Sequence, residues 1–425
     1  MKRAAVVAGC RTPFAKSGTV LKDLTAIDLG KLAVRELVAR TGIKGEDVDQ
    51  LVYGTVVHDP HAGNIAREVG LGTIPKTVPA FTVSRACASA NQAITSGVDL
   101  IARGYADIVI AGGAESLSHI PILIKQQLAE TLIASSRAKT LGKRVRTLAQ
   151  IRPRHLIPNF PAIAEPTTGE SMGQSAERMA KENGISREDQ DAWALRSHQL
   201  AAAGTEDGRL TAEIAPLYIP PRYETVMETD NGIRTDSSLE ALAKLRPVFD
   251  RKHGSVTAAN SSPLTDGASA VLLMSEEKAR AEGIEPLGYV RSYAYSGLDP
   301  RGQLLQGPAY AVPLALDRAG LTMADIDLME MHEAFASQVL SNLQALSSKK
   351  FAEEELGRSE AVGHPDIDRL NVMGGSLAIG HPFGATGGRL TTTLLNEMKR
   401  RDVGLGLITV CAAGALGFAM VVERA

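Results

Sequence analysis

Short apolar runs alternate with amphipathic stretches in the N-terminal part of the chain. The apolar runs predict buried strands at residues 4–8, 50–57, 78–83 and 107–111. Apolar residues recur at helical spacing over residues 26–40 and 88–103, which predicts helices there. Unbroken apolar strands separated by helices indicate a layered α/β fold in which helices cover both faces of the sheet.

The same order of elements returns near the C-terminus. Residues 33–49 resemble residues 311–327 at a constant offset of 278. The strand at 107–111 matches residues 407–411 at an offset of 300, so roughly 22 extra residues are expected in the second copy, within 348–368. Two α/β halves related by duplication are the simplest explanation. Chance similarity between two amphipathic helices is the alternative.

Residues 120–250 differ in character from both halves. They include a predicted helix at 187–203 and a basic segment, 125–154, in which eight Lys and Arg residues accompany one acid, Glu130. An insertion into a duplicated core is a natural place for a substrate-binding lid or loop domain. The basic segment is a solvated helix face, a surface for a membrane or partner, or a site that attracts nucleotide phosphates.

Composition narrows the class of protein. The chain has 425 residues, 44% of them hydrophobic and 22% charged, which is typical of a globular protein with more than one core. Its formal net charge of −2 gives no global signal for nucleic-acid binding. An early break at Arg11-Thr12-Pro13 argues against a signal peptide, and no apolar stretch is long enough to span a membrane, so we expect a soluble, cytoplasmic protein.

The cysteines direct attention to thiol chemistry. There are three of them, Cys10, Cys87 and Cys411, widely spaced and without a C-x-x-C pair. This usage argues against a disulfide framework or a zinc site. No phosphate-binding loop and no metal-ligand spacing is present either, so the chemistry is expected to rest on thiols and histidines.

Cys87 and His381 are a candidate nucleophile and base. Cys87 stands where a predicted strand ends and a helix begins, and the helix N-terminus there is expected to favour the thiolate. His381 lies in a Gly-rich loop, from which it could take a thiol proton near neutral pH. Taken alone, each has a structural alternative, a buried core thiol and a turn histidine.

Cys411 and His332 follow the same logic near the C-terminus. Cys411 ends a strand at a Gly/Ala turn whose N–H groups could form an oxyanion hole. His332 follows a repeat strand and could hold a water or a substrate carbonyl. A core thiol and a histidine that caps the next helix are the alternatives.

Five segments together resemble the thiolase family along nearly the whole chain. Their order and separation carry the resemblance, at residues 84–90, 254–262, 332–335, 380–382 and 411–414. The resemblance implies a duplicated five-layered α-β-α-β-α fold with an inserted loop domain that binds coenzyme A. It implies a division into residues 1–119 with 251–286 as the N-terminal half, 120–250 as the loop domain and 287–425 as the C-terminal half.

The resemblance also implies a role for each matched residue. Cys87 would be the acylated nucleophile, His381 the base for Cys87 and then for the CoA thiol, and Cys411 the acid/base at the α-carbon. His332 would orient a water in a first oxyanion hole, and the backbone N–H groups of Cys87 and Ala413 would form a second. These roles fit C–C cleavage beside a ketone, which must stabilise an enolate and supply one proton without a metal or bound cofactor.

Two further positions match coenzyme A contacts of the family. Arg234 would lie near the nucleotide and Ser262 near the pantetheine. One position departs from the family: Ala415 stands where Gly is usual, which would cost about 1 kcal/mol if the turn needs a positive φ.

Within the family, the chain resembles fatty-acid-oxidation 3-ketoacyl-CoA thiolases of the trifunctional β-subunit branch. His332, the long segment 118–166 and the extra piece 348–368 carry this likeness. The branch implies medium- or long-chain substrates, a homodimer or dimer of dimers, a hydratase/dehydrogenase α-subunit, and a membrane or partner contact through residues 120–155. The alternatives are a short-chain acetyl-CoA acetyltransferase, a β-ketoacyl synthase, which would leave Cys411 unexplained, and a non-catalytic lipid carrier.

Overall fold

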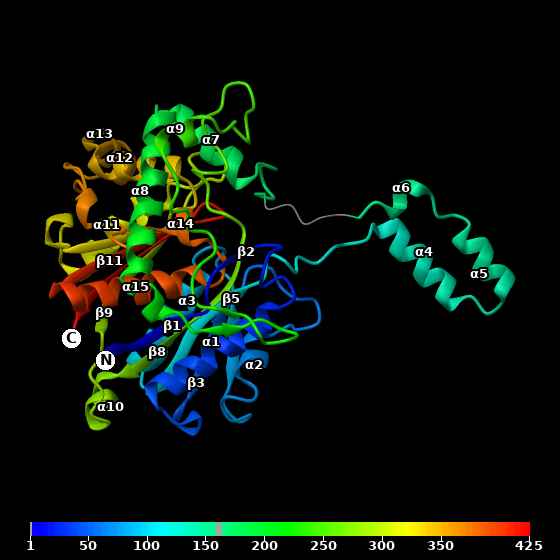
Figure 1. The fold of residues 1–425 in the computed structure, drawn as a ribbon, viewed down its shortest axis with the longest axis horizontal. Coiled ribbons are helices and arrows are strands. Elements are labelled where there is room, and N and C mark those ends of the chain that lie inside the picture. Colours follow the sequence, from blue (N-terminus) through cyan, green and yellow to red (C-terminus); the bar gives the residue numbers. More distant parts are fainter. Residues whose placement is uncertain (1, 159–163) are drawn as a thin grey trace.

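One large sheet organises the chain in a computed structural model that describes residues 2–158 and 164–425 (Figure 1). The strand order is β10-β11-β12-β9-β1-β8-β5-β3-β4, with β2 on β8. The N-terminal half-sheet contains β1 (Ala4–Arg11), β3 (Gln50–Gly54), β4 (Ala80–Val83), β5 (Ile108–Glu115) and β8 (Thr265–Ser275), with β2 at Ala15–Lys16. The C-terminal half-sheet contains β9 (Gly288–Gly297), β10 (Leu328–Met331), β11 (Leu405–Ala412) and β12 (Leu416–Arg424). The halves join where β1 pairs antiparallel with β9.

Helices divide the molecule into five layers. α3 (Ser89–Ala102) and α15 (Thr386–Arg401) lie between the half-sheets, and apolar side chains of all four elements form one core that includes Val52, Ile94, Leu390 and Ile408. The outer faces are covered by α1 (Ala26–Thr41), α2 (Ile65–Gly70) and α10 (Glu276–Ala281) on one side and by α11 (Gly307–Ala319) and α12 (Ala336–Ser347) on the other. The predicted duplicated α-β-α-β-α architecture is confirmed.

The repeat is visible in the element bounds. β3 and β10 begin 278 residues apart, as predicted. β5 and β11 begin at Ile108 and Leu405, so their offset is 297, and the predicted offset of 300 is wrong. Two unbroken apolar strands can be aligned in several registers equally well, so the predicted offset differs from the observed one by three residues. The extra piece of the second half contains α13 (Lys349–Leu356) and lies in the predicted interval.

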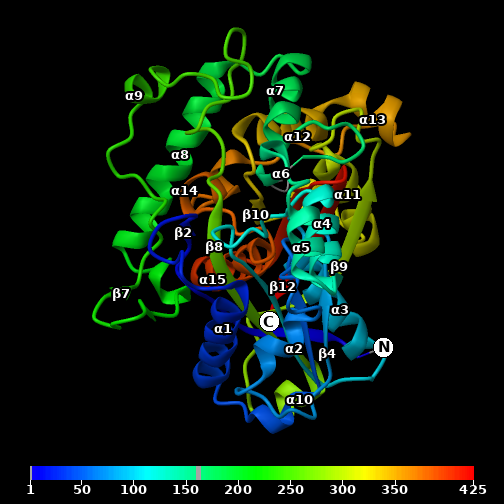
Figure 2. The same cartoon turned by 90° about the vertical axis from the view of Figure 1, so that its right-hand side faces the viewer.

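The middle of the chain forms two groups of helices. α7 (Met172–Glu182), α8 (Arg187–Glu206) and α9 (Leu239–Ala243) belong to the first, and α7 and α8 pack on α12 of the C-terminal half. The second group, α4 (Gln126–Arg137), α5 (Leu141–Leu148) and α6 (Pro153–Leu156), is a hairpin that projects from the body in Figure 1 and toward the viewer in Figure 2.

The remaining elements are short. They are α14 (Ser376–Ile379), the hairpin of β6 (Leu217–Tyr218) with β7 (Val226–Met227), and 3-10 turns at Gly45–Asp47, Thr211–Glu213, Met323–Asp325 and Ile367–Arg369. None of the helices in the described ranges combines the length and apolarity that crossing a membrane requires.

Candidate active site

Cys87 lies on a tight turn between β4 and α3. Ala86 has φ +45°, a conformation that residues with a Cβ rarely adopt. The Ser89 hydroxyl closes the turn, since it donates to Ala86 O at 2.7 Å and accepts from Arg85 N at 2.8 Å. A strained backbone beside the candidate nucleophile is typical of residues held for chemistry.

His381 faces Cys87 from the loop between α14 and α15. Its Nε2 lies 3.2 Å from Cys87 Sγ, and its Nδ1 lies 2.6 Å from Thr386 Oγ1. The Thr386 hydroxyl donates its proton to Pro382 O at 3.1 Å, so its oxygen is left to accept from His381 Nδ1–H. This arrangement leaves the Nε2 lone pair pointing at the thiol, as a general base requires.

The resting pair is a neutral thiol and a neutral imidazole. Burial lowers the pKa of His381 to about 3, with the charge of Arg389 adding to the effect. Burial also raises the pKa of Cys87 to about 11, although backbone N–H groups of Ala413 and Cys87 oppose this. Backbone N–H groups do favour the thiolate, as predicted, but desolvation outweighs them and the resting thiol stays protonated.

Cys411 reaches the same cavity from the end of β11. Its side chain is fully buried, and burial raises the pKa of this thiol well above its usual value, with Cys87 contributing next. The thiol therefore stays protonated and can act as an acid. Glu165 fixes the following turn, because its carboxylate accepts a hydrogen bond from Gly414 N at 3.0 Å. Ala415 has φ +56°, so the condition under which Ala is costly at this position is met.

His332 lies behind His381, with ring centroids 4.0 Å apart. Its Nδ1 lies 2.9 Å from Ser376 Oγ, which also accepts from Arg389 at 3.2 Å. Its Nε2 is buried and has no hydrogen-bond partner among the described residues. A buried nitrogen with free bonding capacity beside the base is suited to hold a water or a carbonyl oxygen.

One group of described residues has the donors for a soft cation. Cys87, His332 and His381 place one ligand atom each within 4.8 Å of one another. A thiolate with two imidazoles suits Zn²⁺. The same atoms are the ones in position for acyl transfer, so a cation held there would block that chemistry.

An apolar cavity of about 530 Å³ opens onto these groups. Its lining includes Cys87, His381, Cys411 and Ser262, and apolar side chains such as Val57, Leu264, Met172 and Phe335. Ile120, Pro121 and Leu123, at the base of the helical hairpin, form part of its wall. This wall could not be predicted from sequence, because short apolar stretches in a loop do not show where they pack.

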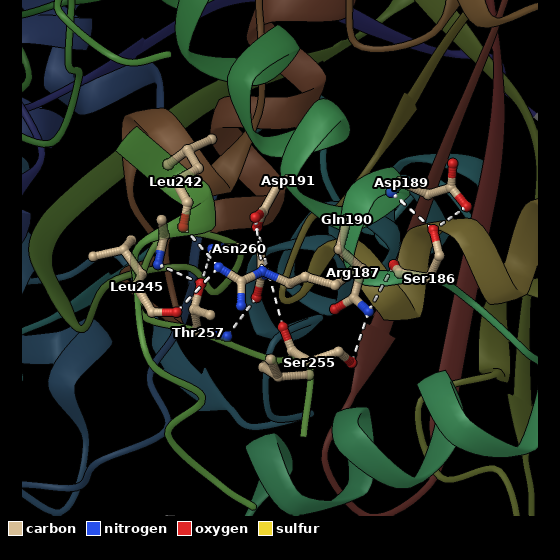
Figure 3. Close-up of polar contacts among 12 residues, drawn as sticks. Ser186, Arg187, Asp189, Gln190, Asp191, Leu242, Leu245, Ser255, Thr257 and Asn260 are labelled. Carbon is tan, nitrogen blue, oxygen red and sulfur yellow. Dashed lines mark hydrogen bonds and ion pairs between the residues drawn. The ribbon is translucent and has the colours of Figure 1, made fainter. Parts of the chain in front are cut away.

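Ser262 is held at the cavity by both halves of the chain. Its N–H donates to Ala334 O at 2.9 Å. The preceding segment is anchored to α8, because Asn260 donates to Asp191 at 3.0 Å and Gln190 donates to Ser255 at 2.9 Å (Figure 3). This network holds the segment that leads from Ser255 to Ser262, which lines the cavity.

Arg234 does not join the cavity. Its side chain is exposed, and its backbone N–H donates to His198 Nδ1 at 3.2 Å. The structure thus brings Cys87, His381, Cys411, Ala413 and Ser262 into one cavity lining, with His332 directly behind, and leaves Arg234 outside. Sequence reasoning missed Thr386, for which its place five residues beyond His381 in the same Gly-rich loop was the available signal.

Comparison with known proteins identifies the family. The model of the thiolase N-terminal domain matches residues 4–277, and that of the thiolase C-terminal domain matches residues 284–424. The chain is 55% identical over 422 residues to a 3-ketoacyl-CoA thiolase of Yersinia pestis (strain Pestoides F), covering 99% of this chain and 97% of that protein.

Solved structures of similar fold support the same family. The Bacillus anthracis acetyl-CoA acetyltransferase has a TM-score of 0.87 at 32% identity, covering 100% of this chain and 99% of that one. Human mitochondrial 3-ketoacyl-CoA thiolase in complex with CoA has a TM-score of 0.84 at 32% identity, covering 100% and 98%. The chain therefore belongs to the thiolase family and is an acyltransferase enzyme.

Proposed function

We propose that this protein is a 3-ketoacyl-CoA thiolase of fatty-acid β-oxidation, which cleaves 3-ketoacyl-CoA with free CoA to give acetyl-CoA and a shortened acyl-CoA. The observation that carries the proposal is the 3.2 Å contact between His381 Nε2 and Cys87 Sγ, at the wall of an apolar cavity that Cys411 shares. The name of the Yersinia pestis relative, at 55% identity, supports the same substrate class.

The first half-reaction transfers the acyl group to Cys87. His381 Nε2 takes the thiol proton as sulfur attacks the ketone carbon. The bond between the ketone carbon and the α-carbon then breaks, and its electron pair becomes the enolate of acetyl-CoA. Cys411 supplies the proton to that carbon, and the oxygen charges are stabilised by His332 with a water and by the N–H groups of Cys87 and Ala413.

The second half-reaction regenerates the thiol. The proton that His381 took from Cys87 first passes to the Cys411 thiolate, which returns both groups to their neutral resting forms. His381 then takes the proton of an incoming CoA thiol, whose sulfur attacks the acyl–Cys87 thioester. The Cys87–acyl bond then breaks, and the Cys87 thiolate that is released takes a proton to become the thiol again. No metal or bound cofactor takes part in either half, and coenzyme A is a substrate. Ping-pong kinetics follow from the acyl-enzyme intermediate.

Thiolysis of 3-ketoacyl-CoA from C4 to C16, measured on the purified chain and on Cys87→Ala, tests this function. Activity that extends to long chains and vanishes in the variant supports it. Activity confined to C4 supports the short-chain acetyltransferase alternative. If no 3-ketoacyl-CoA of any chain length reacts while CoA still binds, the result supports the alternative of a non-catalytic lipid carrier, and the proposal fails.

We infer that the substrate preference extends to medium or long chains. The cavity is lined mainly by apolar side chains, and Ile120 and Leu123 at the base of the hairpin add to its wall. An acyl tail along this wall would be stabilised by about 0.8 kcal/mol per buried methylene. This contribution gives longer chains the higher kcat/KM.

Coenzyme A is assigned to residues 120–250, the loop domain, between an N-terminal half of 1–119 with 251–286 and a C-terminal half of 287–425. Ser262 at the cavity mouth suits the pantetheine, and Arg234 with neighbouring Lys16 gives an exposed cationic surface for the nucleotide phosphates. Binding of CoA to Arg234→Ala and Ser262→Ala, measured by calorimetry, tests the two contacts separately.

The helical hairpin is the surface that we assign to a membrane or a partner. It combines basic residues with exposed apolar ones, such as Leu141 at 78% and Val145 at 59% exposure. Apolar groups among cations favour an anionic lipid surface. A hydratase/dehydrogenase α-subunit is the other partner that the branch implies.

A homodimer or a dimer of dimers is the assembly that we infer. β4 ends the sheet with one edge unpaired among the described residues, and Phe81 on it is 38% exposed. Edges of this kind pair readily with a second copy of the same chain. Sedimentation equilibrium tests the assembly.

The three free thiols support a reducing compartment such as the cytoplasm.

A further inference from the structure

Glu115, the last residue of β5, is a fully buried carboxylate that the mechanism above leaves without a role. Its oxygens accept hydrogen bonds from the backbone N–H groups of Val56 at 3.0 Å, Val57 at 2.9 Å and Gly384 at 2.9 Å. The Thr55 hydroxyl is a further donor at 3.3 Å. A buried carboxylate with this many donors fixes the backbone that supplies them.

These donors belong to the two sides of the active site. Val56 and Val57 line the cavity directly. Gly384 lies in the loop that carries His381 and Thr386, and the ring of its neighbour Phe383 packs on His381 with centroids 4.9 Å apart. One carboxylate therefore joins the cavity wall to the loop of the catalytic base.

The loop approaches Glu115 so closely that only glycine fits at Gly384. A Cβ on Gly384 would lie 2.8 Å from Ala114 O and 3.0 Å from Gly54 O. A Cβ on Gly113 would collide with Gly384 O at 1.9 Å. The backbone of this loop is thus pressed against the ends of β3 and β5, and its N–H reaches Glu115 for that reason.

Glu115 also acts on Cys87 through its charge. Burial raises the pKa of Glu115 to about 7, while the N–H groups of Val57, Gly384 and Val56 favour the ionised form. Burial is the main reason for the high pKa of Cys87, and the charge of Glu115 raises it further. His381, His332 and Cys411 also lie near Cys87, and burial keeps all three neutral in the resting site.

We propose that Glu115 is a positioning residue, which holds the His381 loop against the cavity wall. The proposal rests on the thiolase function proposed above. Glu115 makes no contact with substrate, and it affects the rate through the geometry of the Cys87–His381 pair.

Glu115→Gln tests the positioning role and the effect of the Glu115 charge on Cys87, with Glu397→Gln as the matched control. Glu397 is also a buried carboxylate, but it contacts Arg400 and Arg401 at the end of α15. Two readouts are measured: thiolysis, and the rate of alkylation of Cys87 by iodoacetamide from pH 6 to 10. The second needs no substrate, so it still reports on Glu115 if thiolysis is absent in the wild type.

Glu115→Gln is expected to lower kcat by ~10- to 100-fold with little change in KM, as displaced catalytic groups do. It is expected to move the alkylation profile toward lower pH, because a negative charge that raises the pKa of Cys87 is lost. Glu397→Gln should change neither. An unchanged alkylation profile in a folded Glu115→Gln, or thiolysis within twofold of wild type, overturns the proposal.

Glu115→Asp covers the case in which Glu115→Gln does not fold. It keeps the charge and shortens the reach by one methylene, so kcat should fall while the alkylation profile stays in place. A folded Glu115→Asp with wild-type kcat overturns the proposal, since no positioning contact would then depend on the length of the side chain.

Discussion

Thr386 Oγ1 lies 2.6 Å from His381 Nδ1 and gives its own proton to Pro382 O, so it selects the tautomer in which His381 Nε2 is free to take a proton. The catalytic base thus depends on a hydroxyl that never meets the substrate. Its orientation is set within a single loop, because Pro382 and Thr386 both lie within five residues of His381.

Thr386→Val removes this acceptor while it keeps the shape of the side chain. We expect kcat to fall by roughly tenfold, the value of one hydrogen bond of about 1.4 kcal/mol. Thr386→Ser retains the hydroxyl and should keep near-wild-type activity. Steady-state thiolysis measures both. Equal activity of the Val and Ser variants would show that the tautomer does not depend on Thr386.

His198 makes the folded chain sensitive to acid. Burial lowers its pKa to about 4, and Arg234 and Lys16 add to the effect, whereas an unfolded histidine titrates near about 6.5. The folded pKa is the lower one, so the stability is fully present above about pH 6.5 and is lost as pH falls toward 4. Between pH 7.5 and 4.5 this one side chain should remove about 2.5 kcal/mol from the free energy of unfolding.

His198→Asn tests this pH dependence, because the amide oxygen can still accept from Arg234 N. Urea unfolding at pH 7.5 and 4.5 should show a smaller loss of stability in the variant than in the wild type. Equal losses in both proteins would place the acid sensitivity elsewhere, for instance at His332 and His381, which are also buried and neutral.

The layered fold was predictable from sequence because periodicity reports directly on burial. The apolar runs at residues 4–8 and 107–111 correspond to β1 and β5, although both strands extend to Arg11 and Glu115. The extensions contain polar or glycine residues that are buried by segments distant in the sequence, such as Asp230 on Arg11 and Gly384 on Gly113. A local pattern cannot show such burial.

The active site was predictable only in part. Cys87, His381 and Cys411 stood out because their residue types carry chemistry and their turns are rich in Gly and Ala. Glu115 did not, because a carboxylate at the end of an apolar run resembles a residue that faces solvent. The net ionisation of Cys87 could not be predicted either, because the desolvation that outweighs the N–H groups depends on the packed cavity.

The helical hairpin is expected to bind anionic lipid. Lys143→Glu with Arg144→Glu should weaken binding to phosphatidylserine vesicles by at least roughly 30-fold, since each basic residue near the surface contributes about 1 kcal/mol. Both side chains lie on the exposed α5. Lys349→Glu with Lys350→Glu on α13 makes the same change in net charge and should leave binding intact. Vesicle co-sedimentation distinguishes them, and equal binding by the two variants would contradict a lipid role for the hairpin.

Cys411→Ala should separate the two halves of the reaction. The cleavage of 3-ketoacyl-CoA needs a proton at the α-carbon, so we expect kcat for thiolysis to fall by ~10²- to 10⁴-fold. Exchange of labelled CoA into acetyl-CoA passes through acyl–Cys87 without a proton at the α-carbon, so it should continue close to the wild-type rate. Cys10→Ala is the control, because Cys10 is a buried thiol that donates to Ala33 O and should affect neither reaction. Loss of exchange together with thiolysis would instead place Cys411 in the formation of the acyl-enzyme.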